Sequence, residues 1–230
     1  MFKAKLLRIT FDLNLLFDEL AAFRGAVAHR AGPEHHLFHN HIDDTRLRYS
    51  YPLIQYKLLS RKASIICIQD GVEEIDAFFF KSDLRISLNG KIIDLKIENL
   101  KAYQATLNVY DSVFRYNISN WLALNEKNYR LYKALKDSDE QVQFLERILT
   151  GNLISMAKGL GYQVEKEITV SIVKIKNLFT RTYKETKFQV FHADFDTNFF
   201  LPDYIGLGKN ASIGYGVVRR VRSIKCVESE

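Results

Sequence analysis

The sequence predicts an α+β protein made of two tandem ferredoxin-like (βαββαβ) domains, and three observations support this. In the first half, the apolar residues follow strand and helix periodicities in the order strand, helix, strand, strand, helix, strand. The second half repeats the start of this order with a longer helical segment. A glycine-rich loop then stands where the second helix of that repeat is expected. A chain of 230 residues is long enough for two small domains.

The first predicted strand covers residues 3–11, and a helix is expected after it. Asp12 is a suitable N-cap residue for that helix. The apolar residues that follow at helical spacing are Leu13, Leu16, Phe17, Leu20, Phe23 and Val27. Gly32-Pro33 ends the helix, so the histidine-rich stretch that follows is predicted to be a loop at its C-terminal end.

The next elements of the first half are short. Residues from Arg46 to Tyr51 alternate in polarity and predict a half-buried strand, in which Leu47 and Tyr49 share the face of Tyr51. Pro52 marks an edge or a bulge. The remaining expectations are a strand at 65–68, a short helix at about 71–81, and strands at 84–88 and 92–97 joined by the Asn89-Gly90 turn.

The second half begins with a strand-like segment at 107–118. A helical region follows at about 125–160, broken near Asp137-Ser138, and one of its faces carries Val142, Leu145, Leu149, Leu153, Met156 and Leu160. We then expect a strand at 165–176, a hairpin-like pair across 179–194 and a last strand at 214–226. The domain boundary is predicted near residue 105, giving a domain at 1–105 with the histidine-rich loop and one at 106–230 with the glycine-rich loop.

Composition limits the function classes. The net charge of +6 and the pI near 9.1 permit nucleic-acid binding without proving it. No apolar run approaches the 18 or more residues of a membrane span, and the N-terminus lacks a signal peptide's uninterrupted apolar core. Cys67 and Cys226 make neither a disulfide framework nor a cysteine metal site, so a reducing cytoplasm is expected.

The glycine-rich loop carries Gly206, Gly208, Gly214 and Gly216. Glycine exposes backbone N–H groups and lets another backbone approach, so phosphate or RNA is one candidate ligand, whereas a tight turn explains the loop equally well. It matches neither a dinucleotide fingerprint nor a Walker motif. Basic residues lie in and after the loop, and a second basic group follows the histidines; either group can be a solvated surface. These residues are Lys209, Arg219, Arg220, Arg222 and Lys225, and Arg46, Arg48, Lys57, Arg61 and Lys62.

Five of the six histidines lie between His29 and His41, and three interpretations remain open. In the first, His39 and His41 are the general base and general acid of phosphodiester cleavage, and Arg46, Arg48 or Lys57 stabilises the developing charge. In the second, zinc or a similar metal is bound by His35, His36, His39 and His41 with Asp43 or Asp44. In the third, the histidines belong to a polar surface loop.

Four segments carry a resemblance to a known family. They are Phe23-Arg-Gly25 with His39-Asn-His41, Arg48-Tyr-Ser-Tyr-Pro-Leu-Ile-Gln-Tyr-Lys57, the segment 149–160, and Leu201-Pro-Asp-Tyr-Ile-Gly-Leu-Gly-Lys-Asn-Ala-Ser-Ile-Gly-Tyr-Gly216. With these segments in this order, the chain resembles the CRISPR-associated endoribonucleases that cut precursor CRISPR RNA within its repeats, members of the RAMP superfamily. It is most similar to the branch found with type I-B-like systems.

The resemblance implies two tandem ferredoxin-like domains and cleavage without a metal or other cofactor. The implied products carry a 5′-hydroxyl and a 2′,3′-cyclic phosphate. The implied catalytic histidines map onto His39 and His41, and Tyr49, Tyr51 and Lys57 are carried over as helpers. Both tyrosines can instead pack in the core, and Lys57 can instead be an exposed strand residue. His29, His35 and His36 are not evident parts of the family pattern and are RNA contacts or loop residues.

The implied partner is CRISPR repeat RNA. Its expected contacts are the glycines of the loop together with Arg46, Arg48, Lys209, Arg219 and Arg220. The alternative is a catalytically silent RAMP subunit that only binds RNA within a CRISPR effector complex, and a zinc-dependent nuclease ranks third. Association with effector subunits or with a second copy of the chain stays open, and no membrane partner is expected.

Overall fold

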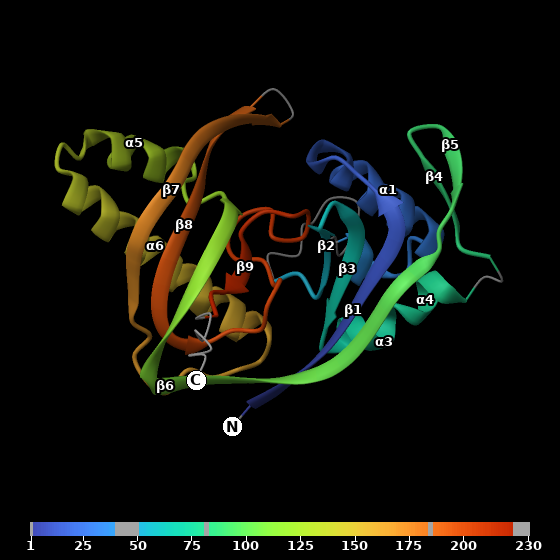
Figure 1. Ribbon diagram of the computed structural model, residues 1–230, viewed down its shortest axis with the longest axis horizontal. Helices are drawn as coiled ribbons and strands as arrows, with labels where there is room; N and C mark the ends of the chain where they lie inside the picture. Colours follow the sequence, from blue (N-terminus) through green and yellow to red (C-terminus); the bar gives the residue numbers. More distant parts are fainter. Residues whose placement is uncertain (1, 40–50, 81–82, 184–185, 223–230) are drawn as a thin grey trace, which may run out of the picture.

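The longest strand of the protein, β6 (Ile97–Trp121), belongs to both halves of the chain. The computed structural model describes residues 2–39, 51–80, 83–183 and 186–222. The first part of β6 pairs antiparallel with β1 (Phe2–Asn14), and the second part pairs with β8 (Thr186–Phe200) and β9 (Val217–Arg220). In Figure 1, β6 therefore runs without a break from one half of the molecule to the other.

Strand β6 begins at Ile97, ten residues before the strand predicted at 107–118, whereas the strand predicted at 92–97 corresponds to the separate strand β5 (Lys91–Asp94). Residues 97–102 are exposed on both faces of the strand, and residues 103–106 are exposed or half-buried. The alternation that marks a half-buried strand is therefore absent there. The predicted boundary near residue 105 falls within β6 and stays a prediction.

The N-terminal half has the strand order β2-β3-β1-β6, all antiparallel, which is the ferredoxin-like arrangement. Its helices α1, α3 and α4 cover one face of this sheet (Figure 1). The bounds of the remaining elements are α1 (Leu20–Ala31), β2 (Ile54–Leu59), β3 (Lys62–Ile68), α3 (Asp70–Glu74) and α4 (Asp76–Phe79). The helix predicted at about 71–81 is thus two short helices.

The first helix begins later than predicted. Asp12 lies within β1, where its amide donates a hydrogen bond to Lys96 (2.8 Å), so its assignment as an N-cap is wrong. A 3₁₀ turn (Phe17–Glu19) leads from β1 into α1. The apolar residues at 13, 16 and 17 suit a strand end and a turn as well as a helix. The predicted stop is confirmed, since Gly32 follows α1 with a φ of +118°.

The histidine-rich stretch contains a helical turn, α2 (His36–His39), which the loop prediction missed. The strand predicted at 46–51 falls largely outside the described residues, and Tyr51, its last residue, is not in a strand. The Asn89-Gly90 turn is confirmed: it joins β4 (Arg85–Leu88) to β5 (Lys91–Asp94), with positive φ at both turn residues. This hairpin is a separate two-stranded sheet.

The C-terminal half repeats the arrangement with the strand order β9-β6-β8-β7. Its helices α5 (Glu126–Ala134) and α6 (Ser138–Gly159) confirm the predicted helical region and its break, and Asp137 caps α6 through its side chain. The predicted apolar face of α6 is confirmed, since Leu145, Leu149, Leu153 and Met156 are fully buried.

The strands that follow α6 differ from the prediction. The hairpin predicted across 179–194 is confirmed, but its first arm is continuous with the strand predicted at 165–176: both belong to one long strand, β7 (Val170–Tyr183), which pairs with β8 along its whole length. No helix occurs between β8 and β9, as predicted, and the glycine-rich loop fills that position. The last strand, β9, ends at Arg220, and part of its predicted extent lies outside the described residues.

Two large cores lie between the sheet and the helices of each half. A smaller cluster joins the halves and contains Ile213 and Tyr215 of the glycine-rich loop, with Phe17 packed against them.

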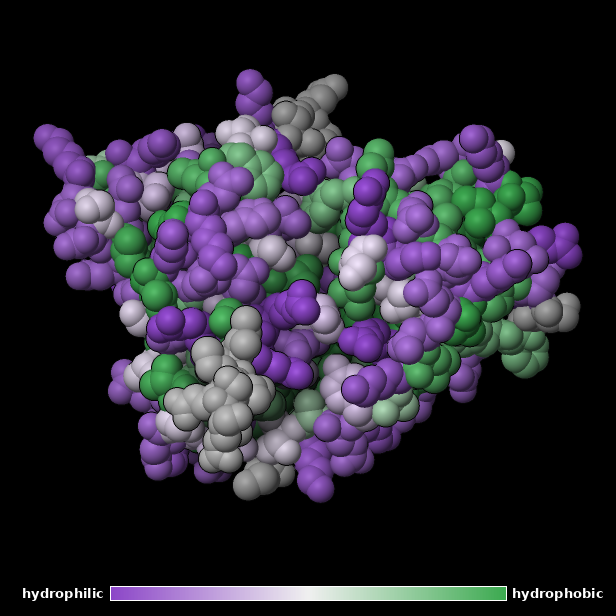
Figure 2. All heavy atoms as spheres, in the orientation of Figure 1, coloured by the Kyte–Doolittle hydropathy of each residue, from purple (hydrophilic) through white to green (hydrophobic). Residues whose placement is uncertain are grey.

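The surface in Figure 2 is mostly hydrophilic, and hydrophobic side chains gather at the end that carries β4 and β5, where Ile92 is 70% exposed. Within the described residues, no helix is long and apolar enough to cross a membrane.

Candidate active site

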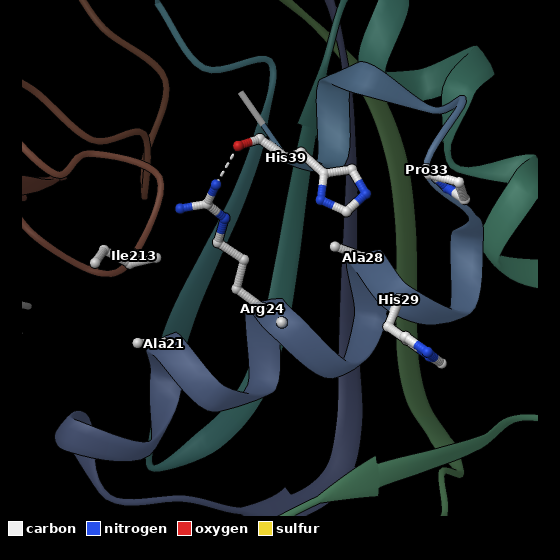
Figure 3. A pocket seen from close by; sticks show the side chains of 8 residues that line it. Ala21, Arg24, Ala28, His29, Pro33, His39 and Ile213 are labelled. Atoms are coloured by element: carbon white, nitrogen blue, oxygen red, sulfur yellow. Dashed lines mark hydrogen bonds between the residues drawn. The ribbon is translucent and has the colours of Figure 1, made fainter. Parts of the chain in front are cut away.

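A pocket of about 540 Å³ lies between α1, α2 and the glycine-rich loop. Arg24 and His29 line it from α1, His39 lines it from α2, and Ile213 lines it from the loop. Figure 3 shows these side chains around the space, with Ile213 on the side opposite His29. The pocket therefore brings His39, a predicted catalytic residue, next to Ile213 of the glycine-rich loop, although the two residues lie far apart in the sequence.

His39 is the last residue of α2, and its ring has a defined contact. Its Nε2 lies 3.3 Å from the carbonyl oxygen of Gly32. A carbonyl only accepts hydrogen bonds, so Nε2 carries the hydrogen in this contact. In the neutral ring the lone pair is then on Nδ1, which makes Nδ1 the nitrogen that can accept a proton.

The other histidines differ from His39 in their surroundings. His35 is held by Glu74 of α3, with 2.9 Å between its Nδ1 and the carboxylate. His36 is exposed on α2. His29 lines the same pocket as His39, a position that was not predicted from the sequence. His41, Asp43 and Asp44 lie outside the described residues. Among the described residues, no three His, Cys, Asp or Glu side chains are grouped so that they can hold a metal.

Arg24 was missed as a site residue, although it lies in one of the segments that carry the family resemblance. Its Nε donates a hydrogen bond to the carbonyl of Phe38 (3.4 Å), and its Nη2 donates to the carbonyl of His39 (Figure 3). The sequence offered no periodic signal for this role, because the contact joins α1 to the end of a helix that was not predicted.

Tyr51 and Lys57 lie under the glycine-rich loop, and neither lines the pocket. The Tyr51 hydroxyl donates to the carbonyl of Gly206 (2.9 Å), and the Lys57 ammonium donates to the carbonyl of Ala211 (2.6 Å). Lys57 is fully buried, so the expectation of an exposed strand residue is wrong. Burial raises the pKa of the Tyr51 hydroxyl, and it lowers the pKa of Lys57 to about 7. Tyr49 lies outside the described residues.

The loop glycines are packed against protein. The amide of Gly206 donates to Gln55 Oε1 (2.8 Å), and the amide of Gly216 donates to Asn120 (3.0 Å). A Cβ on Gly216 would lie 1.9 Å from the carbonyl oxygen of Leu207. Packing therefore accounts for these glycines. RNA contact by Gly206, Gly208, Gly214 and Gly216 stays a prediction.

Of the basic residues predicted in and after the loop, Lys209, Arg219, Arg220 and Arg222 are described, and all four are exposed. Lys209 lies over the ring of Phe188, with 4.6 Å between its Nζ and the ring centroid. Arg219 and Arg220 extend from β9, and Arg220 lies over the rings of Phe114 (5.1 Å) and Phe200 (5.3 Å). Arg46 and Arg48 lie outside the described residues.

A second pocket, of about 530 Å³, is found where the two halves meet on β6. It combines Arg220, which the sequence predicted, with Arg8, Tyr103 and Tyr204, which it did not. The guanidinium of Arg8 lies 5.4 Å from the Tyr204 ring centroid. Cations and aromatic rings on one surface are typical of RNA-binding grooves.

Comparisons with known proteins agree with this arrangement. Two family models match, the Cas6b N-terminal domain over residues 2–106 and the Cas6b C-terminal domain over residues 108–221. An uncharacterized protein of Methanocaldococcus jannaschii is 38% identical over 137 residues, which are 59% of this chain and 92% of that protein.

Solved structures show the same fold. "Crystal structure of Cas6b" has a TM-score of 0.87, and "Crystal structure of CRISPR RNA processing endoribonuclease Cas6b" has a TM-score of 0.73. Each is 27% identical and covers 96% of this chain and 100% of its own. The type IV Cas6 crRNA endonuclease Csf5, 14% identical with a TM-score of 0.57 and the same coverage, shares the fold.

Proposed function

This chain belongs to the Cas6b family, and on that premise we propose that it is an endoribonuclease that cleaves precursor CRISPR RNA within its repeats. The observation that carries the proposal is the pocket that His39 and Ile213 of the glycine-rich loop both line. A related solved structure is named a CRISPR RNA processing endoribonuclease, which supports the same substrate class.

The proposed reaction needs two proton transfers and no metal. One histidine removes the proton from a ribose 2′-hydroxyl, whose oxygen attacks the adjacent phosphorus and forms the new P–O bond. The P–O5′ bond breaks, and a second histidine donates a proton to the leaving oxygen. The products are a 2′,3′-cyclic phosphate and a 5′-hydroxyl. Each such group typically contributes on the order of 10²–10⁴-fold in rate.

His39 and His41 are the proposed pair. The contact between Nε2 of His39 and Gly32 supports Nδ1 as the nitrogen that accepts a proton. The role of His41 rests on its position two residues further along the chain. Tyr49 stays a predicted helper.

For Tyr51 and Lys57 we propose positioning in place of direct chemistry. Both hydrogen bonds end on loop carbonyls, and Lys57 is fully buried. A hydroxyl with a raised pKa remains protonated at neutral pH, which suits a donor to a carbonyl.

The proposed RNA surface includes Lys209, Arg219 and Arg220, with Arg46 and Arg48 as further predicted contacts. The cation–aromatic pocket at the junction of the halves extends this surface to Arg8 and Tyr204. Association with effector subunits or with a second copy stays a prediction. The proposed site of action is the reducing cytoplasm, which suits the free, buried thiol of Cys67.

The test is single-turnover cleavage of repeat RNA from the same CRISPR array in the presence of chelator. We expect cleavage by the wild type and by Arg130→Gln, an exposed α5 substitution. We expect His39→Ala to cut at least about 100-fold more slowly while its RNA affinity changes little. RNA binding without any cleavage would support the silent-subunit alternative, and cleavage only after metal addition would contradict the metal-independent reaction.

A further inference from the structure

We propose that Arg24 is a positioning residue for cleavage, because it holds the backbone at the end of α2 and thereby aims the ring of His39. This proposal rests on the proposed role of His39. It adds to that role a specific requirement for a guanidinium at position 24.

The first argument is the instability of α2 by itself. This helix has four residues, His36–His39, which is far below the length at which a helix is stable alone. The last carbonyls of any helix also lack partners within the helix. An outside donor is therefore needed to hold the residue that carries the catalytic ring.

Arg24 supplies that donor twice. Its Nε donates to the carbonyl of Phe38, and its Nη2 donates to the carbonyl of His39. A planar guanidinium presents these two N–H groups in a fixed geometry, whereas a lysine ammonium is a single flexible centre. These two hydrogen bonds, which we call the Arg24 fork, therefore restrain the direction of the backbone at His39 as well as its position.

The ring of His39 has a second anchor on α1. Gly32 directly follows that helix, and its carbonyl contacts Nε2 of His39. The backbone of His39 is thus tied to Arg24 within α1, and its ring is tied to Gly32 directly after α1, eight residues further along the chain. Losing the Arg24 fork would leave the ring contact without a fixed backbone, and displacement of a reacting group by about 1 Å can cost on the order of 100-fold in rate.

The orientation of Arg24 follows from helix geometry. Ala21, Arg24 and Ala28 are spaced by three and four residues, so they share the face of α1 that lines the pocket. Small residues on either side leave room for the arginine side chain to reach across to α2 (Figure 3).

The experiment compares Arg24→Gln and Arg24→Lys with Arg130→Gln, an exposed arginine on α5. We expect both Arg24 variants to cut repeat RNA about 10- to 100-fold more slowly at saturating enzyme, with RNA affinity within about threefold of the wild type. Arg130→Gln is expected to match the wild type. A wild-type cleavage rate in Arg24→Lys would overturn the positioning role, because positive charge at position 24 would then be sufficient. A lower RNA affinity with an unchanged cleavage rate would overturn it as well.

Two further measurements separate positioning from misfolding and from failure of the proposed function. In a His39→Ala background, Arg24→Gln should slow cleavage no further, because its effect passes through His39. The NMR signal of the His39 ring, assigned by its loss in His39→Ala, should shift in Arg24→Gln and stay in place in Arg130→Gln. This readout needs no cleavage, so it tests the proposal even if the wild type proves inactive. An unmoved His39 signal would refute it.

Discussion

The ammonium group of Lys57 in β2 donates a 2.6 Å hydrogen bond to the carbonyl oxygen of Ala211, although the two residues are 154 positions apart. Next to this contact, the amide of Tyr56 donates to the carbonyl of Ser212 (2.7 Å), and Tyr56 forms a parallel bridge with Ile213. The glycine-rich loop therefore continues the edge of the N-terminal sheet at β2. Contacts with the N-terminal half therefore hold the glycine-rich loop of the C-terminal half in place, and this loop lines the pocket through Ile213.

Lys57 should make stability depend on pH. Burial lowers its pKa from 10.5 to about 7, so between these values the unfolded chain binds more protons at this residue than the folded chain does. The free energy of unfolding, measured relative to Lys57→Met, should therefore be flat below about pH 7 and rise by a few kcal/mol towards pH 10.5. Urea unfolding of both proteins across this range checks the prediction. A constant difference would contradict the lowered pKa.

Gly216 should not tolerate a side chain. Its φ is +61°, and a Cβ would lie 1.9 Å from the backbone oxygen of Leu207. We expect Gly216→Ala to lower the free energy of unfolding by at least about 2 kcal/mol. The matched control is Gly151→Ala in α6, where a Cβ meets no atom within 4 Å, and it should raise stability by about 0.5–1 kcal/mol. Equal effects of the two substitutions in thermal unfolding would refute the packing role of Gly216.

Tyr51→Phe distinguishes loop positioning from chemistry. The substitution removes the hydrogen bond to Gly206 and should cost about 0.5–1.5 kcal/mol of stability. The cleavage rate should fall by less than about tenfold, whereas loss of an acid or base typically costs on the order of 10²–10⁴-fold. Tyr129→Phe, at an exposed tyrosine of α5, is the control for both measurements. A hundredfold slower Tyr51→Phe enzyme with normal stability would restore Tyr51 as a catalytic helper.

Arg219 and Arg220 should contribute to RNA affinity through phosphate charge. Each Arg→Gln substitution should reduce the slope of log affinity against log salt by slightly less than one, because one fewer phosphate is neutralised. Affinity should fall similarly for repeat RNA and for unrelated RNA of the same length. Fluorescence anisotropy at several salt concentrations measures this, with Arg130→Gln as the control. Unchanged slopes in both variants would exclude β9 from the RNA surface.

Much of the fold was predictable because its signals are local. The break between α5 and α6 follows from the capping side chain of Asp137, and the buried face of α6 follows from its apolar spacing. The Asn89-Gly90 turn is likewise a local preference. The length of β6 was not predictable, because residues 97–106 at its start are exposed or half-buried and show no alternation.

The site was predictable only in part. His39 and the glycine-rich loop were identified from residue types, and both line or border the pocket. Arg24 was missed because its partners are backbone carbonyls, which every residue has and which no sequence pattern marks. His29 was set aside for lack of a pattern, yet it lines the pocket from the exposed face of α1.

The sequence by itself determined most of the order of the elements, the Asp137 cap, the Asn89-Gly90 turn, the buried face of α6 and the residue types available for proton transfer. These depend on neighbours within one or two turns of the chain. Only the tertiary structure decided that the two halves share β6, that Lys57 and Tyr51 bind the loop, and that Arg24 holds His39. Each of these contacts joins backbone groups or buried side chains that are distant in the sequence or belong to elements that were not predicted. Their contributions to stability therefore arise only once the chain has folded.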